Sequence, residues 1–101
     1  MHPLLEDNRE KIAALCRQYG VKRLDVFGSI LRDDFDPATS DVDVVAEFDL
    51  AWNGSALRQY FDFKSELESA LGRPVDIIER RVRNPYVDSA IQRSRVPFYA
   101  P

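Results

Sequence analysis

A chain of 101 residues can build one hydrophobic core but is too short for a catalytic domain plus a separate substrate domain, so residues 1–101 are expected to form a single domain. Hydrophobic residues make up 45% and charged residues 31%, a balance that excludes a disordered chain. The net charge of −3 and pI near 5.1 argue against stable binding to nucleic acid. No long apolar run or signal-like start directs the chain to a membrane, and a lone Cys16 in an apolar-periodic segment fits a core position in a reducing cytoplasm.

The first predicted element is a helix over residues 4–19, followed by Gly20 at the position where a helix ends. The segment VKRLDVFGS then predicts a strand that runs into a tight turn, with one helical turn through Leu31. The apolar residues that recur at helical spacing in the first element are Leu5, Ile12, Leu15 and Tyr19.

The polar segment DDFDPATS contains Pro37 and predicts a surface loop, after which DVDVVAEF predicts a largely buried strand. Residues 55–71 predict a second helix that ends at Gly72, and PVDIIE predicts a third strand. The apolar stripe expected on that helix consists of Leu57, Phe61, Leu67 and Leu71.

Asn84 and Pro85 are typical of the start of a last helix, and the chain closes with the short apolar stretch VPFYA. The order helix, strand, strand, helix, strand, helix predicts an α+β fold, in which helices pack on a small mixed sheet. The sequence does not reveal the order of the strands.

Paired acidic residues stand at the start of the second strand. Side chains two apart in a strand share a face, so Asp41 and Asp43 are expected to project together. Their repulsion is relieved if a cation neutralises them, although a D-x-D pair also occurs on solvated edge strands. Asp76 repeats the pattern inside PVDII and is the natural third ligand. Oxygen ligands without nearby histidine or cysteine favour magnesium or manganese over zinc, since the sole histidine, His2, lies at the terminus.

A glycine-serine pair follows the first strand. A glycine at position 28 lets backbone N–H groups approach a phosphate, and Ser29 adds a hydroxyl donor. These two residues are therefore candidates for binding the phosphates of a nucleotide.

The segments FGSILR, SDVDVVAEF and LGRPVDII, in this order and over nearly the whole chain, resemble the minimal nucleotidyltransferase family of the DNA polymerase β-like superfamily. The resemblance implies the polymerase β-like nucleotidyltransferase fold, with Asp41 and Asp43 as paired metal ligands and Asp76 as the third carboxylate. Departures from the family pattern, such as Leu31 and Asp33, touch the loop and not the ligands. The residues that the resemblance assigns to the nucleotide are Gly28, Ser29, Arg32 and Ser40, and for Arg32 an ordinary salt bridge remains an alternative.

Small members of this family resemble antitoxins that pair with HEPN-domain ribonuclease toxins. The resemblance implies a cytoplasmic enzyme that uses two Mg²⁺ ions to transfer AMP from ATP to a hydroxyl, that of a tyrosine, on such a toxin. One alternative is a non-catalytic module that neutralises its partner by binding alone. Another is nucleotidyl transfer to a small molecule, to which the lack of a second domain is an objection.

Other conspicuous residues have structural as well as functional interpretations. The aromatic residues Tyr60, Phe61 and Phe63 are more typical of a core or an interface than of base stacking. Trp52 closely follows the second strand and is a candidate for contact with a nucleotide base, although a structural role is favoured. The basic residues after the third strand form either a docking face or a solvated one; they are Arg80, Arg81, Arg83, Arg93 and Arg95.

Overall fold

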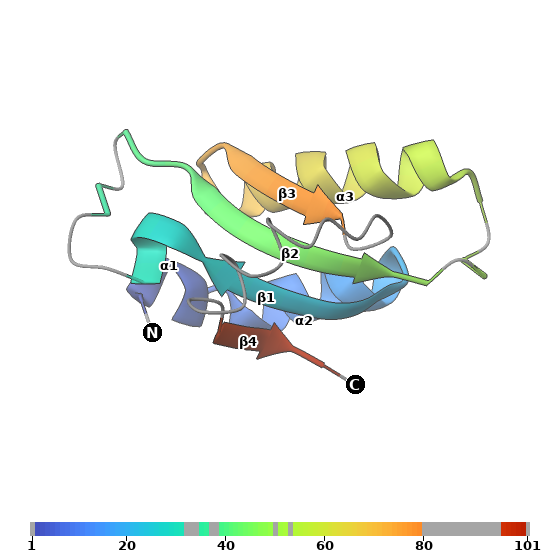
Figure 1. Ribbon diagram of the computed structural model, residues 1–101, viewed down its shortest axis with the longest axis horizontal. Coiled ribbons are helices and arrows are strands. Elements are labelled where there is room, and N and C mark those ends of the chain that lie inside the picture. The colour runs from blue at the N-terminus through green and yellow to red at the C-terminus, as the bar shows by residue number, and fades with distance from the viewer. Residues whose placement is uncertain are drawn as a thin grey trace, which may run out of the picture.

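Four strands form one mixed sheet in the order β3-β2-β1-β4 (Figure 1). β1 (Val21–Phe27) pairs antiparallel with β2 (Val42–Phe48) and with β4 (Val96–Tyr99), and β2 pairs parallel with β3 (Val75–Glu79). The predicted small mixed sheet is therefore confirmed. The computed structural model describes residues 2–31, 35–36, 39–49, 51–52, 54–79 and 96–100.

Two helices, α2 (Arg9–Gln18) and α3 (Ala56–Leu71), cover one face of this sheet, and Figure 1 shows both behind the strands. Alternate residues of the two central strands face them, because side chains alternate between the faces of a sheet. No helix among the described residues is long and apolar enough to span a bilayer. The core between sheet and helices includes Ile12, Leu15, Leu24, Val26, Val42, Val44, Ala46, Phe63 and Leu67.

The helix predicted over residues 4–19 is interrupted. α1 (Pro3–Glu6) ends after one turn, and α2 begins beyond Asn8. The Asn8 side chain donates to the carbonyl of Leu4 at 2.8 Å, and its own backbone leaves the helical region. Asparagine side chains compete with the helix for backbone partners, which explains the break. The prediction was correct for most of the segment and wrong in its continuity.

The predicted ends of α3 agree with the structure, but its predicted apolar stripe is only half right. The Ser55 hydroxyl accepts from the N–H of Arg58, and Gly72 adopts a left-handed conformation at φ +67°. Leu57 is 68% exposed and Phe61 54% exposed, so neither belongs to the core. The face that is buried consists of Gln59, Phe63, Leu67 and Leu71.

Gln59 takes a core position because its amide donates to two main-chain carbonyls, those of Tyr19 at 2.8 Å and Asp49 at 3.2 Å. A buried amide is tolerated when it is hydrogen-bonded. Trp52 has the structural role that was favoured, since its indole N–H donates to the carbonyl of Gln18 at 3.0 Å. Cys16 is fully buried, and burial raises the pKa of its thiol to about 12, so it is a core residue.

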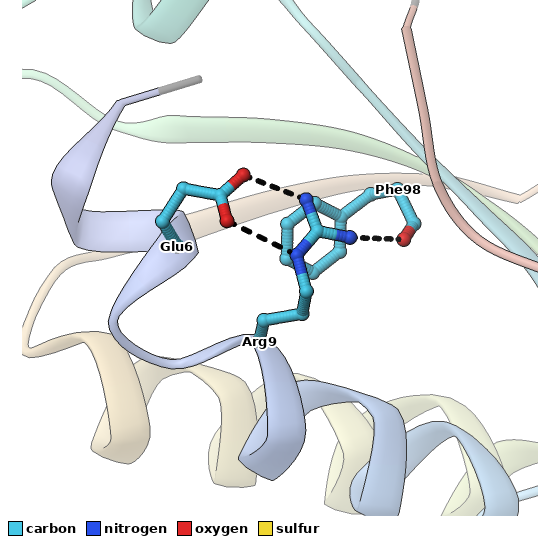
Figure 2. Close-up of polar contacts among 3 residues, drawn as sticks. All are labelled: Glu6, Arg9 and Phe98. Carbon is cyan, nitrogen blue, oxygen red and sulfur yellow. Dashed lines mark hydrogen bonds and ion pairs between the residues drawn. The ribbon is translucent and has the colours of Figure 1, made fainter.

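β4 is an element that the sequence did not predict. It closes the outer edge of β1, and Arg9 fastens it to the helical layer (Figure 2). The Arg9 guanidinium donates to the carboxylate of Glu6 at 2.7 Å and to the carbonyl of Phe98 at 3.2 Å. It also lies 4.3 Å from the centre of the Phe98 ring. The last predicted helix, from Asn84, and the five arginines that follow Glu79 lie outside the described residues.

Candidate active site

The site is built around two carboxylates on neighbouring strands. In the parallel ladder of β2 and β3, Asp43 is the register partner of Asp76. Their neighbours Val42 and Val75 are buried on the side of the sheet that carries the helices. Because side chains alternate along a strand, Asp43 and Asp76 project from the opposite face, on strands about 5 Å apart.

Asp41 lies just outside this ladder. It is exposed and immediately precedes β2, whose first register pair is Val42 with Val75. Among the described residues, no group of three or more aspartate, glutamate, histidine or cysteine side chains lies close enough to hold a metal ion. The structure thus pairs Asp43 with Asp76 and leaves the Asp41 carboxylate beside them rather than in one cluster with them.

This donor set is compatible with magnesium. Mg²⁺ is usually held by one or two carboxylates together with water and substrate phosphate oxygens, rather than by a complete cage of protein ligands. Asp43 and Asp76 offer two such oxygen ligands from neighbouring strands, and the exposed Asp41 immediately precedes one of these strands. The residues present therefore fit a divalent cation whose coordination the triphosphate completes.

Gly28 lies against the Asp43 carboxylate. It opens η1 (Gly28–Leu31), a single 3₁₀ turn directly after β1, and has φ +80°. A Cβ atom built on Gly28 would overlap Oδ2 of Asp43 and lie 3.1 Å from its Cγ. Only glycine allows this close approach of the main chain to the carboxylate. A phosphate bound on the Gly28–Ser29 turn would therefore be adjacent to Asp43.

The other residues predicted to bind the nucleotide are Ser29, Ser40 and Arg32. Ser29 is half-buried within η1. The Ser40 hydroxyl accepts from the N–H of Asp36 at 3.0 Å, so this side chain closes the loop ahead of β2, and a contact with nucleotide stays a prediction. Arg32 lies outside the described residues.

Sequence reasoning missed two charged residues near this site. Asp25 is only 1% exposed, and Nε of Arg23 donates to it at 3.0 Å on the sheet face that also carries Asp43. Arg73 donates through its Nε to the carbonyl of Ser40 at 3.0 Å, one residue before Asp41. Both residues stand in segments that carry a visible pattern, since Asp25 alternates with Leu24 and Val26 in LDVF and Arg73 stands three residues before Asp76. Asp25 has its arginine partner two residues away, whereas the Ser40 partner of Arg73 is remote in sequence.

Comparison with known proteins places this geometry in a family. A model of the nucleotidyltransferase domain matches residues 9–96. A protein of Methanocaldococcus jannaschii that is inferred to be a protein adenylyltransferase is 32% identical over 92 residues, which cover 91% of this chain and 95% of that protein.

Solved structures give the same result. The structure of an inferred minimal nucleotidyltransferase matches with a TM-score of 0.73 and 31% identity and covers 96% of each chain. A structure of a tri-AMPylated Shewanella oneidensis HEPN toxin in complex with an MNT antitoxin matches with a TM-score of 0.66 and 18% identity, over 95% of this chain and 72% of that chain. A toxin–antitoxin structure with AMP-PNP matches with a TM-score of 0.70 and 20% identity, over 93% of this chain and 74% of that chain. The two more distant matches show the fold alone, and the polymerase β-like fold that was expected is confirmed.

Proposed function

Because the chain belongs to the nucleotidyltransferase domain family, as a minimal nucleotidyltransferase, we propose that it transfers AMP from ATP to a hydroxyl group of a partner protein. The observation that carries the proposal is the register pair of Asp43 and Asp76 on the sheet face next to the Gly28–Ser29 turn. A pair of carboxylates beside a glycine turn suits the transfer of a nucleotide from a triphosphate.

Each residue has a distinct part in the proposed reaction. The backbone N–H groups of the Gly28–Ser29 turn bind the β- and γ-phosphates, which brings the α-phosphorus over the paired carboxylates. Asp41, Asp43 and Asp76 would hold two magnesium ions, which when bound would neutralise the triphosphate and lower the pKa of the attacking hydroxyl. The acceptor oxygen bonds to the α-phosphorus, the bond to pyrophosphate breaks, and Asp76 accepts the proton.

The partner that we propose is a HEPN toxin, which AMP transfer would neutralise. The Shewanella oneidensis complex supports this proposal, because there a tri-AMPylated HEPN toxin is bound to an MNT antitoxin of the same fold. A tyrosine is the proposed acceptor, since a phenol, with an ordinary pKa of about 10, releases its proton more readily than an aliphatic hydroxyl. The reaction would take place in the cytoplasm.

The test is transfer of label from ATP to a HEPN partner in the presence of magnesium, with Asp43→Asn and Asp76→Asn as the informative variants. Asp62→Asn is the matched control, since Asp62 is an exposed aspartate on α3. Wild type and the control should label the partner, whereas the two site variants should lose on the order of a thousandfold in rate. Equal labelling by Asp43→Asn would refute the proposed site.

A second candidate function, neutralisation by binding alone, is favoured by one observation. Leu57 and Phe61 lie one turn apart on α3 and are both largely exposed, as is common at protein interfaces. Neutralisation that survives Asp43→Asn but is lost in Leu57→Ser with Phe61→Ser would favour binding over catalysis. The reverse pattern would favour nucleotidyl transfer.

A further inference from the structure

The main chain on both sides of Asp41 is hydrogen-bonded to the segment that leads into β3. The carbonyl of Ser40 accepts from Nε of Arg73 at 3.0 Å, and the N–H of Val42 donates to the carbonyl of Pro74 at 2.9 Å. These two peptide groups flank the Cα atom of Asp41. Because peptide groups are planar, holding both of them restrains the two backbone dihedrals of Asp41 and hence the direction in which its Cα–Cβ bond leaves the main chain.

The segment that supplies these partners is itself anchored. Glu68 of α3 accepts the N–H of Val75 on its side chain at 2.9 Å and the N–H of Gly72 on its carbonyl at 2.8 Å. Arg73 therefore extends from a short connection that is held at both ends. Asp76 follows on the same segment, so Arg73 links the strand of one predicted ligand to the backbone of another.

Of the two hydrogen bonds that flank Asp41, only the one from Arg73 is made by a side chain. Asp41 precedes the first register pair of β2, so the ladder holds the chain only from Val42 onward. The bond from Pro74 is a main-chain bond that substitution leaves in place, whereas the bond to Ser40 depends on the arginine. The direction in which the Asp41 side chain leaves the backbone thus depends in part on one side chain outside the predicted ligand set.

We propose that Arg73 is a positioning residue for nucleotidyl transfer, whose Nε–H acts through the Ser40 carbonyl to aim Asp41 at the cation shared with Asp43 and Asp76. This inference rests on the proposed function. The direction of the change in cation affinity on removing Arg73 distinguishes this role from a purely electrostatic one. A guanidinium that acted only by its charge would repel a cation, so its removal would strengthen cation binding. A positioning role predicts that removal weakens it.

The experiment compares Arg73→Gln with Arg73→Met by measuring the binding of Mn²⁺ alone by electron paramagnetic resonance. The amide nitrogen of glutamine is as many bonds from Cα as Nε of arginine, so Arg73→Gln keeps a donor for Ser40 without the charge. Methionine has a similar length and no donor. Arg73→Met should weaken Mn²⁺ binding about ten- to a hundredfold, as losses of contacts behind a metal ligand do, and Arg73→Gln should stay near wild type.

Further variants separate positioning from other effects of the substitution. Adding Asp41→Asn to Arg73→Met should cause no loss beyond Asp41→Asn alone, because both changes act through one carboxylate. Arg73→Lys keeps the charge but moves the donor, so positioning predicts weaker binding than in Arg73→Gln, even if Arg73→Met does not fold. Arg58→Met, at an exposed arginine of α3, is the matched control and should bind as wild type does.

The failures are distinguishable. Wild-type binding of Mn²⁺ that Asp43→Asn abolishes, together with unchanged binding in Arg73→Met, would overturn the inference about Arg73 and leave the proposed function standing. Binding in Arg73→Lys that is closer to wild type than in Arg73→Gln would also overturn it. A wild-type chain with no Mn²⁺ binding that depends on Asp43 would overturn both.

Discussion

Replacing Gly28 by alanine tests the closest contact in the site. The new Cβ would overlap Oδ2 of Asp43 and lie 3.3 Å from its Cβ, so the carboxylate has to move by on the order of 1 Å, which at a reacting centre costs about a hundredfold in rate. The positive φ of +80° adds backbone strain of about 1–2 kcal/mol for a residue with a side chain. In a domain of this size, that strain lowers the melting temperature by roughly 5–15 °C.

Gly72→Ala separates these two effects. Gly72 has a similar φ of +67°, but a Cβ added there meets nothing within 4 Å. Both variants should therefore lose comparable stability in thermal unfolding, and only Gly28→Ala should also lose AMP transfer, assayed well below its melting temperature. Full transfer activity in Gly28→Ala, or an equal loss in both variants, would show that the contact between Gly28 and Asp43 does not matter for the reaction.

Three further predictions concern the scaffold. Phe63→Ala should lower the free energy of unfolding by about 3–5 kcal/mol in denaturant titrations, because Phe63 is fully buried. Phe61 is half-exposed, so Phe61→Ala should lower this free energy much less. Equal losses in the two variants would contradict the assigned buried face of α3. The hydrogen bond from Arg9 lowers the pKa of Glu6 below its ordinary value of 4.5, so this contribution to stability is present above that value and is lost as pH falls through the lower folded-state pKa. A carboxyl titration by NMR should show the pKa of Glu6 returning to its ordinary value in Arg9→Met, and no change there would be evidence against the contact in Figure 2. The Cys16 thiol, with its pKa raised to about 12, should resist thiol reagents at mildly alkaline pH until the chain unfolds, and rapid labelling of the native protein would show that it is accessible.

Local patterns predicted the elements that hold the site. The β-branched runs around Asp43 and Asp76 and the glycine after Phe27 marked two strands and a turn, and the structure has each of them where expected. The fact that Asp43 and Asp76 are direct partners could not be read from the sequence, because β2 and β3 are joined through a helix and nothing local sets their register.

Apart from the break in the first helix, which the local contact between Asn8 and Leu4 explains, the errors share one cause, since the residues concerned have partners in other elements of the fold. Gln59 displaces Leu57 and Phe61 from the core face because two carbonyls, one 40 residues away, accept its amide. β4 is four residues long and contains Pro97, which is a weak strand signal until the edge of β1 is available for pairing. In the same way, the contact between Arg73 and Ser40 could not be predicted from the sequence, because only the fold brings these two residues together.

The most direct test of the account uses ATP labelled at the α-phosphate and, in parallel, ATP labelled at the γ-phosphate, each incubated with magnesium, this chain and a HEPN partner. Nucleotidyl transfer at Asp41, Asp43 and Asp76 predicts that the α-label becomes covalently attached to the partner and that the γ-label leaves with pyrophosphate. Attachment of the γ-label, or of neither label, would contradict it.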